Sequence, residues 1–364
     1  MKMLIAGGGT GGHLYPGVAL AEEVLTRQKG NEVLFVGTQR GLEFKVLPEL
    51  GLPLETIEVS GLKGTGLSAR ISGLLKLPLA LFSSIRILRR FKPDVAVGVG
   101  GYASGPVILA AWLLRIPTAV LEQNTVPGVT NRLLAKVADA VYVMFDESAA
   151  YFPRKKVQAL GNPIRRQLLE NFLRSKGNAA AGRFQLLVLG GSQGAHNLNV
   201  RMLEATDHLA EVKDRLVIVH QTGVQDELLV KKGYEERGFT AEVLPFIKDV
   251  SEAYRRAELI VCRAGATTLA EVMVVKKASI LVPFPHAADN HQEKNAQSMV
   301  DAGAALMLVE REMDGLRLAE TILTLINDPS RIEKMEQAAS RVGRPEAASE
   351  IVAACVQLIE RRRK

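Results

Sequence analysis

The apolar residues of this chain fall into short, almost uninterrupted runs, separated by segments long enough to form helices. In the first half these runs cover residues 3–6, 32–36, 54–59, 94–99, 118–121, 140–143 and 157–160. Runs that are apolar throughout are typical of parallel strands covered on both faces, because neither face of such a strand meets water. We therefore predict a parallel sheet with helices on both sides.

The pattern restarts after residues 175–183, a loose stretch with two glycines and three successive alanines. New apolar runs cover residues 186–189, 216–219, 241–244, 259–262, 279–282 and 305–309, and from residue 314 the periodicity is helical. Because 364 residues exceed what one hydrophobic core usually serves, we predict an α/β fold of two doubly wound, Rossmann-like domains. The expected domains are residues 1–162 and 163–344, with a final helix in 345–364 that packs back on the first domain.

Each expected domain has a glycine-rich loop between its first strand and the next helix. The first is Gly-Gly-Gly-Thr-Gly-Gly-His at 7–13, and the second is Gly-Gly-Ser-Gln-Gly-Ala at 190–195. Such a unit points backbone N–H groups and the positive end of a helix at one place, which suits an anion. Two loops at matching places predict two domains that face each other across a cleft, with a nucleotide derivative between them.

Other phosphate-binding and metal-binding classes fit less well. The first loop satisfies G-x-G-x-x-G, but the second strand ends without the carboxylate with which a dinucleotide-binding oxidoreductase holds its ribose. His13 stands where a P-loop requires lysine. His286 and His291 lack nearby paired carboxylates and no Asp-x-Asp motif occurs, so neither a metal site nor a cofactor is expected. Helix ends and Arg165 would balance the charge of a diphosphate.

Composition indicates a folded, soluble protein, with 47% hydrophobic and 23% charged residues. The two cysteines, Cys262 and Cys355, argue against a disulfide framework and fit a reducing compartment. The chain runs from Met-Lys directly into a strand, so we expect no signal peptide. Without an uncharged apolar run of about 18 residues, we also expect no transmembrane helix.

The net charge of +7 is unevenly placed along the chain. Residues 59–93 contain no acidic residue and seven basic ones, which are Lys63, Arg70, Lys76, Arg86, Arg89, Arg90 and Lys92. The very apolar segment 74–82 is interleaved with them. This window is either a solvated basic helix above a strip of core or a surface that adheres to an anionic membrane. Nucleic acid is not an expected partner, because only 5% of residues are aromatic and no binding motif occurs.

Two side chains near the loops are candidates for chemistry. His13 falls in the first turn of the helix after the first loop, where the helix end disfavours the imidazolium form. A neutral histidine suits a general base for a sugar hydroxyl, although it could equally cap the helix or fill space. In the segment 262–271, strand, small-residue turn and helix start suit a phosphate. Glu271, one turn inside that helix, can accept both ribose hydroxyls or simply interact with the helix N-terminus.

Seven motifs, taken in order and at their spacing, resemble the peptidoglycan N-acetylglucosaminyltransferases of glycosyltransferase family 28. They occupy residues 8–13, 100–106, 122–124, 161–165, 190–195, 262–271 and 291–296. The resemblance runs from residue 3 to about residue 350. It implies the two-domain GT-B fold and an inverting, metal-independent reaction. N-acetylglucosamine would move from UDP-N-acetylglucosamine to the muramyl C4 hydroxyl of lipid I, giving lipid II.

Carried over by position, the resemblance also implies roles for individual residues. Those of the first domain that touch the donor would be Thr10, Gly11, Gly12, Asn124 and Arg165. Those that bind the nucleotide would be Ser192 at a phosphate, the backbone of Ile247 at the uracil edge, Ala266, Thr267, Thr268 at the α-phosphate, Leu269, Ala270 and Glu271 at the ribose. Gln292 would orient sugar hydroxyls, and Tyr102 and Ser104 would face the acceptor.

The resulting hypothesis is a direct displacement at the anomeric carbon with His13 as the base, or Glu122 if His13 is not the base. Residues 1–162 would form the acceptor and membrane-facing domain, residues 163–344 would bind the UDP-sugar, and the protein would lie peripherally on the cytoplasmic face of the membrane. Three alternatives remain. Another glycolipid glycosyltransferase would keep the basic apolar window, a UDP-N-acetylglucosamine 2-epimerase would not need it, and a non-catalytic sugar-nucleotide-binding subunit would need no base.

Overall fold

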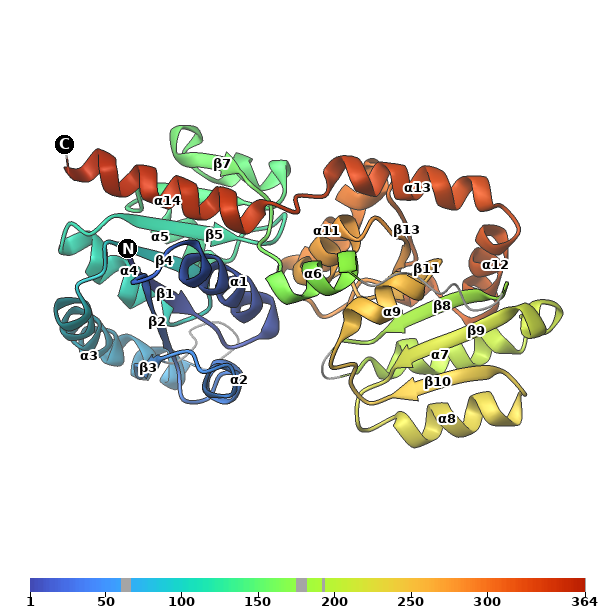
Figure 1. The fold of residues 1–364 in the computed structure, drawn as a ribbon. Coiled ribbons are helices and arrows are strands. Elements are labelled where there is room, and N and C mark those ends of the chain that lie inside the picture. Colours follow the sequence, from blue (N-terminus) through green and yellow to red (C-terminus); the bar gives the residue numbers. More distant parts are fainter. Residues whose placement is uncertain (60–66, 175–181, 192–193, 364) are drawn as a thin grey trace. The chain divides into compact units, whose positions relative to one another are not determined.

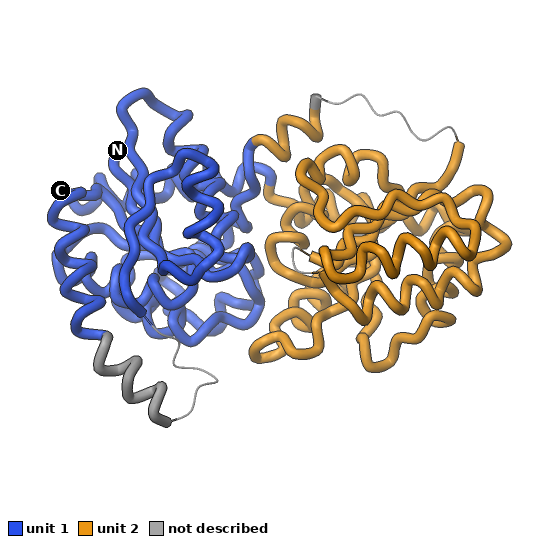
Figure 2. The backbone as a smooth tube through the Cα atoms, turned by 90° about the horizontal axis from the view of Figure 1, so that it is seen from below, with its two compact units in different colours: residues 1–166, 345–364 blue, residues 167–344 orange. Residues whose placement is uncertain are grey.

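The computed structural model describes residues 1–59, 67–174, 182–191 and 194–363, with side chains described from residue 77 onward in the helix that follows the first gap. Within these residues the chain forms two compact units (Figures 1 and 2). Unit 1 comprises residues 1–166 together with 345–364, and unit 2 comprises residues 167–344. Each unit is built around one parallel sheet.

The sheet of unit 1 has seven strands in the order β3-β2-β1-β4-β5-β6-β7, and all neighbouring pairs are parallel. Its strands are β1 (Lys2–Gly7), β2 (Glu32–Gly37), β3 (Leu54–Thr56), β4 (Val95–Gly100), β5 (Thr118–Glu122), β6 (Ala140–Val143) and β7 (Val157–Ala159). The central strands are buried on both faces, as their apolar runs predict. The two edge strands are shorter than predicted and only half-buried or exposed, since each pairs on one side only.

Alternate residues of these strands face two separate layers of helices. The helices of unit 1 are α1 (Gly11–Arg27), α2 (Glu43–Glu49), α3 (Leu67–Phe91), α4 (Ser104–Leu113), α5 (Val129–Leu134) and α14 (Ala347–Arg363), with short 3-10 turns at Asp146–Tyr151 and Arg154–Lys156. Met3 and Ile5 of β1 pack under α1 and α14, whereas Leu4 and Ala6 pack under α3, α4 and α5. This period-two alternation fixes which helices cover which face.

The last helix, α14, returns to unit 1 although it follows unit 2 in the sequence. Its Ile351, Val352 and Cys355 are buried in the same cluster as Leu20 and Val24 of α1. Burial raises the pKa of the Cys355 thiol to about 12, so this cysteine remains an inert thiol in the core. Cys262, in unit 2, is likewise buried and free.

The sheet of unit 2 has six parallel strands in the order β10-β9-β8-β11-β12-β13. They are β8 (Phe184–Leu189), β9 (Leu216–Gln221), β10 (Thr240–Leu244), β11 (Leu259–Cys262), β12 (Ala278–Leu281) and β13 (Ala305–Met307). The helices are α6 (Arg166–Arg174), which begins in unit 1, α7 (His196–Thr206), α8 (Glu227–Glu236), α9 (Val250–Arg256), α10 (Ala266–Val274), α11 (His291–Asp301), α12 (Gly315–Ile326) and α13 (Pro329–Val342). The 3-10 turns are Ala210–Arg215, Ala288–Asn290 and Glu310–Glu312.

In both sheets the strand order reverses beside the first strand of the unit, between β1 and β4 and between β8 and β11. Connections leave the carboxyl ends of these neighbours in opposite directions, and ligands of open α/β sheets bind at such switch points. The two glycine loops follow β1 and β8, so each lies at the switch point of its own sheet. The predicted fold class, two doubly wound α/β domains, is confirmed. Among the helices of the described residues, none is both long and apolar enough to cross a bilayer.

Candidate active site

A buried carboxylate from α2 holds the first glycine loop in place. Glu43 of α2 is 1% exposed and accepts hydrogen bonds from the N–H of Gly9 (2.6 Å) and from the N–H and hydroxyl of Thr38 (2.8 and 3.0 Å). No motif of the sequence pointed to this residue. The N–H of Gly9 is thus used inside the protein, whereas Thr10 and Gly12 at the start of α1 are exposed.

His13 lies in the first turn of α1, as predicted, with its ring half-buried. Its Nδ1 is 3.3 Å from Oε1 of Gln123, which follows β5. The ring lies against the chain at Gly100, whose φ is +99° and where a Cβ would sit 2.5 Å from Nδ1. Glycine is therefore required at the end of β4, both for the backbone conformation and for the room that the imidazole takes.

The two residues predicted to face the acceptor, Tyr102 and Ser104, differ in their exposure to solvent. Tyr102 is 51% exposed and open to a ligand. Ser104 is fully buried, and its Oγ donates to the carbonyls of Ala6 (2.7 Å) and Gly100 (2.9 Å) and accepts from the N–H of Gly100 (3.1 Å). The side chain of Ser104 is therefore bonded within the protein, and its place at the acceptor stays a prediction. Its hydroxyl joins the ends of β1 and β4, because that position of α4 points into the sheet.

Glu122, the second candidate base, is also buried, at 1% exposure. Its carboxylate accepts from the N–H of Asn124 (3.0 Å), the N–H of Gly128 (3.3 Å) and Nδ2 of Asn131 (2.8 Å). Burial raises the pKa of Glu122, and these hydrogen bonds lower it in part. Glu122 thus shapes the turn that presents Asn124, which is half-buried at the end of β5.

Arg165 is stacked on an aromatic ring of α1. Its guanidinium carbon is 4.8 Å from the ring centroid of Tyr15, a cation–π contact. The same ring lies beside Gly11, where a Cβ would be 3.2 Å from it. Within unit 1, therefore, the structure brings Arg165 to the start of α1, near the predicted donor contacts. Tyr15, which sequence reasoning missed, positions it there.

In unit 2 a single side chain connects the second glycine loop with the predicted uracil-reading segment. Gln221, at the end of β9, donates from Nε2 to the carbonyl of Gly191 (3.0 Å) and accepts at Oε1 from the N–H of Ile247 (3.0 Å). A uracil carbonyl that bonds the N–H of Ile247 has to displace this amide oxygen. Ser192 lies outside the described residues.

The turn before α10 presents backbone rather than side chains. Ala266, Leu269 and Ala270 are buried, so their contribution to a ligand is confined to the peptide groups, while Thr267 and Thr268 are half-buried in the first turn. No acidic residue occupies that turn, which leaves the positive helix end unopposed within α10. This arrangement suits a phosphate.

Glu271, one turn further on, is held by a tyrosine that sequence reasoning did not identify. The hydroxyl of Tyr254 in α9 donates to its Oε2 over 2.9 Å. Tyr254 is 1% exposed, so the phenol is fixed by the core. No local pattern relates the two positions, which lie 17 residues apart on different helices.

Gln292 is the second residue of α11, which follows a tight turn in which Asp289 and Asn290 both have φ of +54°. Its Oε1 accepts from the N–H of Phe284 (3.0 Å), which ties the start of α11 to the loop that follows β12. His291 is bonded to the carbonyl of Ala288 through Nδ1 (2.7 Å). Among the described residues, no group of three or more His, Cys, Asp or Glu side chains is arranged to hold a metal ion.

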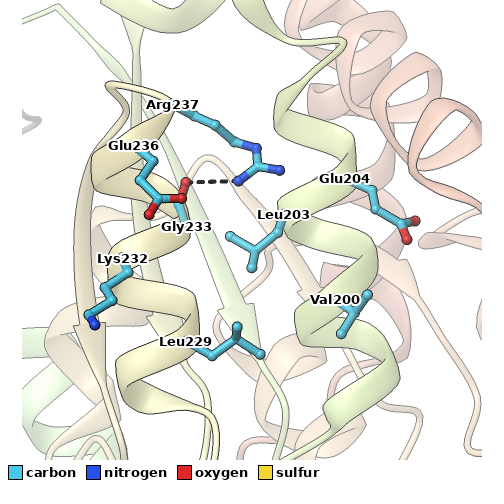
Figure 3. Close-up of a pocket in the computed structure, with 8 residues that line it drawn as sticks. All are labelled: Val200, Leu203, Glu204, Leu229, Lys232, Gly233, Glu236 and Arg237. Atoms are coloured by element: carbon cyan, nitrogen blue, oxygen red, sulfur yellow. Dashed lines mark hydrogen bonds between the residues drawn. The ribbon is translucent and has the colours of Figure 1, made fainter.

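A hollow of about 380 Å³ lies between α7 and α8 of unit 2 (Figure 3). Its lining is Val200, Leu203, Glu204, Leu229, Lys232, Gly233, Glu236 and Arg237. Arg237 donates to the carbonyl of Gly233 (3.2 Å) and pairs with Asp207, whose pKa it lowers. None of the predicted site residues lines this hollow, which lies on the helical flank and not at the carboxyl ends of the strands.

Comparison with known proteins decides the family. Models of the N-terminal and C-terminal domains of glycosyltransferase family 28 match residues 3–143 and 185–351. A UDP-N-acetylglucosamine--N-acetylmuramyl-(pentapeptide) pyrophosphoryl-undecaprenol N-acetylglucosamine transferase from Myxococcus xanthus (strain DK1622) is 58% identical, over 99% of this chain and 93% of its own length. The chain belongs to the MurG family of glycosyltransferases.

Other members of the MurG family are also similar to this chain along nearly its whole length. The transferase of the same name from Geobacter sulfurreducens is 51% identical over 97% of each chain. The crystal structure of Acinetobacter baumannii MurG superimposes with a TM-score of 0.80 at 32% identity, covering 98% of this chain and 99% of that one. A UDP-GlcNAc 2-epimerase from Neisseria meningitidis gives a TM-score of 0.69 at only 14% identity, over 98% of this chain and 100% of that one. That likeness concerns the fold alone.

Proposed function

We propose that this protein transfers N-acetylglucosamine from UDP-N-acetylglucosamine to the muramyl C4 hydroxyl of lipid I, with inversion at the anomeric carbon, and so forms lipid II. The observation that carries this conclusion is the 58% identity with a named transferase along almost the whole chain. The residues at the two switch points supply the chemistry, and each takes a separate part in binding or transfer.

His13 acts as the general base. Its Nε2 accepts the proton of the acceptor C4 hydroxyl while that oxygen forms a bond to the anomeric carbon of the donor. The bond from the anomeric carbon to the diphosphate breaks, and UDP leaves as the anion. Arg165, the start of α1 and the start of α10 stabilise the negative charge that develops on the diphosphate. Exposed Tyr102 contacts the acceptor.

The donor nucleotide binds to unit 2. Glu271, oriented by Tyr254, accepts the ribose hydroxyls, Thr268 and the peptide groups of residues 266–270 bind the α-phosphate, and Ile247 reads the uracil edge. Gln292 orients the hydroxyls of the sugar. From unit 1, Thr10, Gly11, Gly12 and Asn124 contact the donor sugar and diphosphate. The turn that carries Asn124 is fixed by the buried Glu122.

One surface of unit 1, formed by α3 and α4, binds the cytoplasmic leaflet of the membrane, which carries the lipid-linked acceptor. Leu79 and Phe82 of α3 are each 69% exposed, and Arg86 and Arg89 continue the same stripe at spacings of three and four residues. Trp112 and Leu113 of the adjoining α4 are exposed as well. We call this set (Leu79, Phe82, Arg86, Arg89, Trp112 and Leu113) the lipid surface. Apolar side chains beside arginines suit an anionic lipid interface.

Not every basic residue of the window belongs to the lipid surface. Arg90 forms an ion pair with Glu55 of β3, so its charge is partly balanced inside unit 1. Lys63, Arg70 and Lys76 lie outside the side chains that the structure describes. Among the other basic side chains that the structure describes in the window, Arg86, Arg89 and Lys92 are exposed, and Arg86 and Arg89 lie in the stripe that we propose to meet anionic lipid.

The deciding experiment is incubation of the purified protein with labelled UDP-N-acetylglucosamine and a short-chain lipid I analogue. We expect label in a disaccharide-lipid product whose formation requires the analogue. Label in UDP-N-acetylmannosamine without acceptor would instead identify an epimerase, and transfer to an unrelated glycolipid but not to lipid I would identify another acceptor.

A further inference from the structure

Within the proposed reaction, we infer that Gln123 is a positioning residue that sets the proton of His13 on Nδ1 and leaves Nε2 as the basic nitrogen. This inference rests on the proposed role of His13 as the base. Neither the motif pattern nor the likeness to known proteins assigns a role to Gln123. Its evidence is a chain of hydrogen bonds that begins at a backbone carbonyl.

The carbonyl of Val99 fixes the orientation of the Gln123 amide. The side chain is 1% exposed, and its Nε2 lies 2.8 Å from the carbonyl oxygen of Val99 in β4. A carbonyl oxygen can only accept, so the NH₂ end of the amide has to face it. Burial makes the reversed orientation costly, because two oxygens would then face each other away from water.

The oriented amide in turn sets the tautomer of His13. With its NH₂ end turned to Val99, Gln123 presents Oε1 to Nδ1 of His13 at 3.3 Å. An amide oxygen only accepts hydrogen bonds, so the imidazole carries its proton on Nδ1 and its lone pair on Nε2. Neutral histidine in water favours the opposite tautomer, with the proton on Nε2, and in that form Nε2 cannot act as a base.

Gly100 and Gln123 together fix the position of the His13 imidazole. The imidazole lies on Gly100, which leaves no room for any side chain at that point. The ends of β4 and β5 thus supply both the surface beneath the ring and the hydrogen-bond acceptor at its Nδ1 edge. An amide fixes the tautomer without adding charge, whereas a carboxylate in its place would favour the imidazolium, which cannot accept a proton.

Two variants of similar length separate this role from packing. Gln123→Met fills the space but offers Nδ1 no acceptor of comparable strength. Gln123→Glu keeps an acceptor for Nδ1–H, and in its protonated form it also donates to the Val99 carbonyl as the amide does. The tautomer is read directly from the ¹⁵N chemical shifts of the imidazole in histidine-labelled protein near pH 8. The His13 signals are identified among the six histidines by their loss in His13→Ala.

We expect the Nδ1–H tautomer in the wild type, a proton kept on Nδ1 in Gln123→Glu, and a shift toward Nε2–H in Gln123→Met. Single-turnover transfer in Gln123→Met should fall by roughly 10- to 100-fold, the scale on which removing a partner that orients a histidine acts, with UDP affinity unchanged. A wild-type His13 protonated on Nε2, or a tautomer that Gln123→Met does not alter, overturns the inference. So does an altered tautomer with full turnover in Gln123→Met, if His13→Ala abolishes transfer.

A different result would show that His13 is not the base although Gln123 sets its tautomer. If the tautomer follows Gln123 while His13→Ala transfers sugar at the wild-type rate, His13 is not the base, and the coupling between Gln123 and the imidazole stands. Calorimetric UDP affinity, measured for all three variants, confirms that unit 2 still binds the nucleotide.

Discussion

The hydroxyl of Tyr254 donates a hydrogen bond to Oε2 of Glu271 over 2.9 Å. The phenol is buried in unit 2, so its hydroxyl orients the carboxylate of Glu271, which lies one turn inside α10. A carboxylate that has to accept two ribose hydroxyls gains from being oriented before the nucleotide arrives, because less conformational freedom is lost on binding.

Removing either member of this pair should weaken use of the donor by different amounts. Glu271→Ala deletes a charged acceptor and should cost about 1.5–3 kcal/mol in kcat/KM for UDP-N-acetylglucosamine. Tyr254→Phe only releases the carboxylate and should cost about 1 kcal/mol, mostly as a higher KM. Steady-state kinetics of the two folded variants checks this. Full efficiency in Glu271→Ala would exclude the ribose assignment, and an equal loss in both would make the tyrosine a direct ligand.

Ser104 and Tyr102 should respond oppositely to truncation. Ser104→Ala leaves the Ala6 and Gly100 carbonyls without their hydroxyl donor in the core, which should lower the free energy of unfolding by about 1–3 kcal/mol. Tyr102→Ala removes an exposed ring and should leave stability within about 0.5 kcal/mol while raising KM for the lipid I analogue. Urea unfolding and acceptor titrations test the pair. A stable Ser104→Ala with a raised acceptor KM would instead make the Ser104 hydroxyl an acceptor contact.

The lipid surface predicts a selective loss of vesicle binding. Each basic residue near an anionic bilayer contributes about 1 kcal/mol, so changing Arg86 and Arg89 together to Gln should weaken the partition to anionic vesicles by about 2 kcal/mol, roughly 30-fold. UDP affinity should not change. Sedimentation with vesicles of defined anionic content, at low and high salt, measures the effect.

The matched control changes Lys231 and Lys232 of α8 to Gln, which removes the same charge from exposed positions of unit 2. That variant should bind vesicles as the wild type does. Equal losses in both variants would mean that net charge alone governs adhesion, and no loss in either would mean that the arginines of α3 are only solvated.

A buried histidine makes the stability of unit 2 sensitive to acid. His220 lies between the hydroxyl of Tyr234 (2.8 Å from Nδ1) and Oδ1 of Asn199 (3.0 Å from Nε2), and burial lowers its pKa to about 3. The unfolded chain binds a proton there below about pH 6.5, whereas the folded unit does not until about pH 3. This residue therefore reduces stability as the pH falls from 6.5, by up to about 1.4 kcal/mol per pH unit, and contributes no pH dependence above that range.

His220→Gln cannot titrate and should flatten this dependence, whatever its effect on stability at neutral pH. Hydrogen exchange of the β9 amides at pH 7 and pH 5, corrected for intrinsic exchange rates, gives the opening free energy of unit 2 in both proteins. Parallel pH dependences in the two would contradict the assignment.

The sequence alone determined which segments form the strands of the two sheets. Residues 140–143 and 259–262 were predicted as strands with the bounds that β6 and β11 have. A strand covered on both faces has to be apolar at every position, so the information is local and can be read from the chain. The glycine loops were placed correctly for a similar reason, since a strand, a turn and a helix start are adjacent in sequence.

The partners of the site residues were decided only by the tertiary structure. Gln123 lies 110 residues from His13, and Glu43 lies 34 residues from Gly9, with no periodic signal between them. They meet because the strand order places the carboxyl ends of β2, β1, β4 and β5 side by side. Ser104 is a further case that the sequence could not decide. Its motif places it near the loop, but only the packing of α4 determined that its hydroxyl bonds to the Ala6 and Gly100 carbonyls. A serine can bond to the protein or to a ligand, and its sequence is the same in both cases.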